Sequence, residues 1–129
     1  MKAERFEAEL RQALAGMVRE MAGEVDAVVV EGPRDREALR ALGYSGPVLL
    51  ASGSGRGRAD FVDSIEERYR TVALLTDFDG EGRALAARLR SRLERSGVKV
   101  APEWRVKLRS LMEGTGCRTV EGLARWADE

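Results

Sequence analysis

The sequence of 129 residues contains no histidine, no asparagine and a single cysteine, Cys117. Without histidine the chain has no Ser-His-Asp or Cys-His nucleophilic site, no imidazole general base and no histidine metal ligand. One cysteine forms no internal disulfide, and without a second thiol or an imidazole it builds no zinc site. If this protein is an enzyme, its carboxylates, arginines, backbone amides and a bound hard metal ion must do the chemistry.

Long hydrophobic runs are also missing. No stretch approaches the roughly 18 consecutive apolar residues of a membrane span. The first residues, MKAERFEAELRQAL, carry charges throughout, unlike a secretory signal. The content of 43% hydrophobic and 34% charged residues is typical of a globular protein, and the length favours one domain, 1–129. We therefore expect a cytoplasmic protein that has no membrane partner.

The spacing of the apolar residues predicts an alternation of strands and helices. Short apolar runs predict strands at residues 28–30, 48–51, 72–76 and 97–102. Spacings of three and four predict helices at residues 3–23, 36–46, 60–69 and 81–96, and two short helices within 101–129. Gly43 is the expected C-terminal cap of the second helix, and Trp104 and Trp126 are expected to be packing anchors. This order predicts an α/β fold with a central, mostly parallel four-stranded sheet, a core at about 26–100 and helical N- and C-terminal extensions.

Acidic residues follow two of the predicted strands. Glu31 ends the first strand, and Asp77 and Asp79 end the third, in LLTDFDGEG. Ligands of such folds bind beyond the carboxyl ends of the strands, and the Asp-x-Asp spacing puts both side chains on one side. Helix capping would explain one of the two aspartates but not both. A bound cation would offset their repulsion, and three oxygen ligands favour Mg²⁺, with Mn²⁺ as a substitute, as one ion or two.

Basic residues are concentrated after Asp79. Residues 83–109 hold nine basic and two acidic residues, a local charge of +7 in a chain of zero net charge. This suits a polyanionic ligand approached through a metal, although a solvated helix face is the simpler interpretation. The glycine-rich ASGSGRG does not match a phosphate loop or a dinucleotide-binding turn. It is either a surface loop or a source of phosphate contacts through Arg56 and Arg58, beside which Arg83 is a third candidate.

The motifs VVVEGPRD and LLTDFDGEG, in this order and at strand ends, resemble the Toprim domain of type IA topoisomerases, DnaG-type primases, a 5S rRNA maturation nuclease and OLD-family nucleases. More narrowly, the chain resembles the small stand-alone archaeal Toprim proteins called primase-like, whose tails carry something like RTVEGLARW. The resemblance implies a Toprim/Rossmann-like three-layer fold and Mg²⁺-dependent phosphodiester cleavage or phosphotransfer on RNA or DNA. It also implies that Glu31 is a general acid/base and metal ligand, and that Asp77 and Asp79 bind the metal, with Asp77 part of the catalytic site.

Other functions remain open at this point. Gly80 stands where topoisomerases commonly have arginine, and we expect neither strand passage nor full primase activity from this chain. LLTDFDGEG also resembles the first motif of haloacid-dehalogenase-type phosphatases, but the residues after Asp79 hold no acidic pair at a strand end, which that family needs. A receiver domain would need an acidic pair after the first strand, where this chain has Glu31 followed by Gly32. A non-catalytic nucleic-acid-binding or assembly module is the main alternative. The terminal helices either cap the sheet or pair with a second copy or a protein partner.

Overall fold

The computed structural model describes residues 2–52 and 58–127, and leaves the side chain of Arg58 undescribed. Its centre is a sheet of four strands, β1 (Ala27–Val30), β2 (Val48–Leu50), β3 (Thr71–Leu74) and β4 (Lys99–Val100). The strand order is β2-β1-β3-β4 and all neighbours are parallel. The predicted four-stranded parallel sheet is confirmed, and β1 and β3, the two strands that precede the acidic residues, lie side by side.

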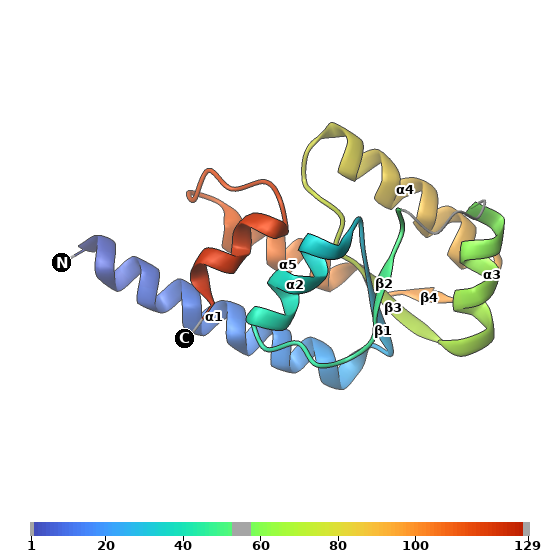
Figure 1. Ribbon diagram of the computed structural model, residues 1–129, viewed down its shortest axis with the longest axis horizontal. Coiled ribbons are helices and arrows are strands. Elements are labelled where there is room, and N and C mark those ends of the chain that lie inside the picture. Colours follow the sequence, from blue (N-terminus) through green and yellow to red (C-terminus); the bar gives the residue numbers. More distant parts are fainter. Residues whose placement is uncertain (1, 53–57, 128–129) are drawn as a thin grey trace.

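Helices cover both faces of this sheet (Figure 1). They are α1 (Lys2–Glu24), α2 (Pro33–Ala41), α3 (Arg58–Arg68), α4 (Gly80–Arg95), α5 (Pro102–Met112) and the 3₁₀ helix η1 (Glu121–Trp126). One core packs α1, α2, α5 and η1 against Val28 and Val30 of β1, and a second core packs α3 and α4 against Ala27 and Val29. The alternation explains why the β1 sequence is apolar at every position, because both of its faces are buried.

Helix α2 differs from its prediction, which placed it at residues 36–46. It begins at Pro33, whose fixed φ suits the first helical position, and it ends at Ala41. Gly43 follows with φ +102°, the left-handed conformation expected of a glycine after a helix. The earlier start places Asp35 in the first turn, where its Oδ2 accepts a hydrogen bond from Gly32 N at 3.0 Å. A residue that the sequence pattern assigned to a loop is therefore fixed at the edge of the sheet.

Strand β4 is shorter than predicted, and this leaves one edge of the sheet open. The last ladder bond runs from Ala101 N to Val72 O at 2.9 Å, after which the chain turns into α5. The carbonyl oxygens of Leu74 and Thr76 therefore have no strand partner. The side chain of Arg105, from α5, donates to both of them, with Nη1 at 3.4 and 2.7 Å. An arginine thus replaces the missing end of the strand.

The terminal helices pack against the first core. Trp104 and Trp126 are 2% and 4% exposed, which confirms that they are packing anchors. Helix α1 buries Leu10, Leu14 and Met21 against the same core. None of the helices in the part of the chain that the structure describes combines the length and the apolar character needed to cross a membrane.

Candidate metal centre

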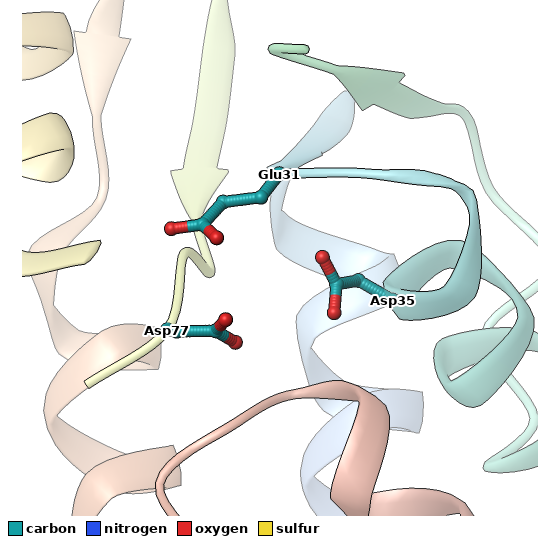
Figure 2. Close-up of side chains that lie close together, drawn as sticks. All are labelled: Glu31, Asp35 and Asp77. Carbon is teal, nitrogen blue, oxygen red and sulfur yellow. The ribbon is translucent and has the colours of Figure 1, made fainter. Parts of the chain in front are cut away.

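Three carboxylates meet beyond the carboxyl ends of β1 and β3. Glu31 follows β1, Asp77 lies shortly after β3, and Asp35 comes from the first turn of α2 (Figure 2). Each offers one oxygen, and the three oxygens lie within 4.8 Å of one another. Because β1 and β3 are hydrogen-bonded neighbours, the two segments that follow them leave the sheet together. The structure therefore brings Glu31 and Asp77 together, as their positions after the strands suggest, and adds Asp35.

Asp79 has a different place. It is the N-cap of α4, and its Oδ1 accepts a hydrogen bond from Gly82 N at 2.7 Å. It is exposed and is not a member of the cluster formed by Glu31, Asp35 and Asp77. Capping thus explains why an aspartate stands at position 79, and the role of Asp79 as a metal ligand stays a prediction.

Backbone amides from the C-terminal segment hold two of the three acids. Asp77 Oδ1 accepts from Val120 N at 2.8 Å, and Asp35 Oδ1 accepts from Glu121 N at 3.1 Å. A backbone bond from Phe78 N to Arg118 O, at 2.8 Å, fixes the same segment beside the site. Asp35 is only 7% exposed, and its amide partners are what make that burial of a carboxylate tolerable. The tail motif RTVEGLARW therefore forms one wall of the cluster.

The electrostatics of the cluster disfavour three ionised carboxylates. Burial, followed by the charge of Asp77, raises the pKa of Glu31 from 4.5 to about 7. Burial also raises the pKa of Asp35, against the opposing effect of the hydrogen bond from Gly32 N. A divalent cation among these oxygens would reverse both effects, because an opposite charge favours the ionised form. The set contains only oxygen donors, which fits Mg²⁺ or Mn²⁺ rather than a softer metal.

Arg105 supports the loop that carries Asp77. Its Nη1 donates to Thr76 O at 2.7 Å, its Nη2 donates to Asp77 O at 3.0 Å, and its guanidinium lies 4.5 Å from the centre of the Phe78 ring. Burial lowers the pKa of Arg105, and the charges of Asp77 and Glu31 oppose this shift. The sequence showed Arg105 only as one of nine basic residues. Its role depends on the early end of β4, for which the local signal is Pro102, a residue without a backbone N–H to continue the ladder.

Gly82 allows the close turn between Asp77 and α4. A Cβ at position 82 would lie 2.0 Å from Asp77 O, so no side chain fits there. The buried Thr76 hydroxyl donates to Gly82 O at 2.6 Å and ties the end of β3 to the start of the helix. Glycine at position 82 therefore sets the path of the backbone that presents Asp77.

The predicted phosphate contacts are only partly located. Arg56 lies outside the described residues, and Arg58 begins α3 with its side chain outside them. Arg83 is exposed in the first turns of α4, close in sequence to the capping residue Asp79. A surface pocket of about 470 Å³ beside Glu31 is also lined by Ser52, Glu81 and Arg88. Through this pocket Glu31 faces the solvent.

Comparison of the sequence with known proteins shows the family to which the chain belongs. The family model of the Toprim domain matches residues 26–104. The chain belongs to the Toprim domain family. It is 37% identical over 100 residues to a UPF0292 protein of Pyrococcus abyssi, a match that covers 78% of this chain and 71% of the relative. A UPF0292 protein of Methanocaldococcus jannaschii is 32% identical over 103 residues, which cover 79% of this chain and 78% of that protein.

The fold of this Toprim protein is also found in a solved structure. A protein from Aquifex aeolicus superposes with a TM-score of 0.66 at 25% identity, over 83% of this chain and 94% of that one. The predicted Toprim-like α/β fold and the resemblance to small archaeal Toprim proteins are thus confirmed. Membership of this family favours a metal-dependent, nucleic-acid-related function over the phosphatase and receiver interpretations.

Proposed function

We propose that this Toprim protein catalyses phosphodiester cleavage or phosphotransfer on nucleic acid. The reaction depends on Mg²⁺, for which Mn²⁺ can substitute. The observation that carries the proposal is the convergence of Glu31, Asp35 and Asp77, from three separate elements, to within 4.8 Å. We propose these three as the metal ligands, with Glu31 also the general acid/base and Asp77 part of the catalytic site. Asp79 remains a fourth candidate ligand at the start of α4.

The three carboxylates are placed for different tasks. A bound Mg²⁺ would polarise a phosphoryl oxygen and stabilise its developing negative charge. Asp77 and Asp35 are held by the amides of Val120 and Glu121, so their remaining oxygen lone pairs keep fixed directions for an ion. Glu31 instead lines the open pocket that Arg88 shares, where a phosphate group has access. This arrangement supports Glu31 as the group that exchanges a proton with the substrate or with water.

A non-catalytic binding module is the second candidate function, and one observation favours it. Asp35 and Asp77 already accept backbone hydrogen bonds, so part of their need for partners is met without an ion. Such a protein would keep the fold and the acidic cluster but would bind nucleic acid without turnover.

Cleavage assays distinguish the two functions. Labelled structured RNA, single-stranded DNA and duplex DNA are incubated with Mg²⁺, with Mn²⁺ and with EDTA. The proteins compared are the wild type, Glu31→Gln, Asp77→Asn and the control Glu37→Gln, an exposed acid on the outside of α2. Cleavage by the wild type and the control that needs metal and is lost in the other two variants would establish the proposed activity. Binding without cleavage in all four proteins would refute it and establish the binding module.

A further inference from the structure

A second surface feature lies at the open edge of the sheet, between α4 and α5. It is a groove of about 660 Å³, within the range of pockets that hold small organic ligands. Its floor is apolar and includes Leu74, Val100, Pro102 and Val106. The groove exists because β4 ends at Val100, so that the helices on the two faces of the sheet are not separated by a further length of strand.

Five arginines also line this groove, against one glutamate. Arg90 is paired with that glutamate, Glu94, at 3.1 Å. Arg95 donates to Ser91 O at 3.3 Å, and Arg105 is bound to the carbonyls of the β3 edge. Arg83 and Arg109 differ from these. Both are exposed, and neither side chain has a hydrogen bond or ion pair with the residues that the structure describes. Two cations are therefore available to an anionic ligand.

Arg83 and Arg109 also connect the groove with a hollow beside Phe78, the residue that follows Asp77. They line a second pocket, of about 350 Å³, whose wall includes Phe78 and Arg118. Phe78 directly follows Asp77, and its amide donates to Arg118 O. A ligand that occupies both hollows would pass between the two free arginines and arrive beside the backbone of the candidate metal centre.

The floor of the groove requires a ligand that is more than an anion. Val106 is 62% exposed, one of two large apolar side chains in the described residues that are exposed to this degree. Phosphate groups make no favourable contact with an apolar floor. An unpaired nucleotide presents both a charged phosphate for the arginines and a base whose two apolar faces can pack on the floor. In a duplex the bases are stacked inside and do not reach such a floor.

We infer that the groove between α4 and α5 binds an unpaired strand of nucleic acid and leads it to Phe78, on the loop that carries Asp77. Arg83 and Arg109 contact successive phosphates where the two hollows meet, and bases lie on the apolar floor around Val106. The inference rests on the proposed function for its choice of nucleic acid as the ligand, and it adds the form of that ligand and the path that it takes.

Binding measurements without metal test the inference separately from catalysis. Fluorescence anisotropy in EDTA follows single-stranded RNA and DNA of about twelve nucleotides, a length within the range that single-strand sites occupy. The double variant Arg83→Glu/Arg109→Glu is compared with Arg19→Glu/Arg68→Glu, two exposed arginines of α1 and α3 that lie outside the groove. We expect a loss of about tenfold or more in the groove variant and a much smaller loss in the control, which has the same net charge.

The salt dependence counts the phosphate contacts. Each contact with a single strand contributes about 0.7 to the slope of log affinity against log salt concentration. The neutral variant Arg83→Ala/Arg109→Ala should therefore lower the slope by about 1.4. Equal losses in groove and control variants, an unchanged slope, or no binding of single strands by the wild type would each overturn the inference.

The apolar floor has its own test. An abasic strand of the same length should bind severalfold more weakly than the normal strand. Val106→Ser should reduce this difference, and because Val106 is exposed, the substitution should leave folding unaffected. Equal binding of the abasic strand, or a preference for duplex, would overturn the base-binding role. If cleavage is absent but these binding results are obtained, the groove stands and the catalytic proposal fails. If cleavage occurs and the groove variants cleave as the wild type does, the catalytic proposal stands and the groove fails.

Discussion

Replacing Gly82 by alanine should displace Asp77. The added Cβ would lie 2.0 Å from Asp77 O and 2.5 Å from its carbonyl carbon, whereas ordinary contacts begin at 3.4 Å. The two backbones must therefore move apart by about 1.4 Å to reach 3.4 Å. Such overpacking costs about 1–3 kcal/mol. Gly80→Ala is the matched control, since the same methyl group two residues earlier meets no atom within 4 Å, and alanine there gains up to about 1 kcal/mol of helix propensity.

Both glycines lie in α4, so the gain in helix propensity applies to both variants. We expect their free energies of unfolding to differ by about 1–3 kcal/mol, with Gly82→Ala the less stable. Urea denaturation of both variants measures this difference. Because displacement of a reacting group by about 1 Å typically costs about a hundredfold in rate, Gly82→Ala should also lose cleavage while Gly80→Ala retains it. Equal stability of the two variants within about 0.5 kcal/mol, together with equal Mg²⁺ response, would refute this account of the turn.

Three further predictions concern the charged residues of the centre. Arg105→Met should lose about 2–3 kcal/mol of stability in urea denaturation because the partly buried carbonyls of Thr76 and Asp77 lose charge-assisted bonds, whereas Arg109→Met should stay within about 0.5 kcal/mol; equal losses would contradict this. Since the folded state raises the pKa of Glu31 from 4.5 to about 7, the melting temperature in EDTA should fall as pH rises through this window, and Glu31→Gln should flatten the fall. Asp35→Asn should abolish stabilisation by Mg²⁺, whereas Asp79→Asn should preserve it; the reverse would make Asp79 the ligand.

The sequence allowed prediction of those parts of the centre that depend on strand ends. Glu31 and Asp77 follow apolar runs that indicate buried strands, and their proximity is expected if those two strands are neighbours, which the structure shows. Asp35 was missed because the apolar pattern of α2 begins after it. The signal for the earlier helix start was present, as Pro33 suits the first helical position and Asp35 the first turn.

The contributions of the chain beyond α4 could not have been predicted in the same way. The bonds from Val120 and Glu121 to the two aspartates are made by backbone amides, which have no residue-specific signature, and they join positions 43 and 86 residues apart. Arg105 is one basic residue among several, and only the early end of β4 creates the carbonyls that it binds. Contacts of this kind depend on tertiary packing that no periodicity in the sequence encodes.

These long-range contacts imply a division of roles within the centre. The Toprim match ends at residue 104, yet two of the three clustered acids accept bonds from residues 120 and 121. The matched segment therefore supplies the carboxylates, and the segment after it fixes their orientation. Leu123 and Trp126 of η1 are buried in the first core, which anchors these amides. An ion that binds here would meet two aspartates already oriented by the tail and would need to recruit only Glu31, the acid that opens onto the surface pocket.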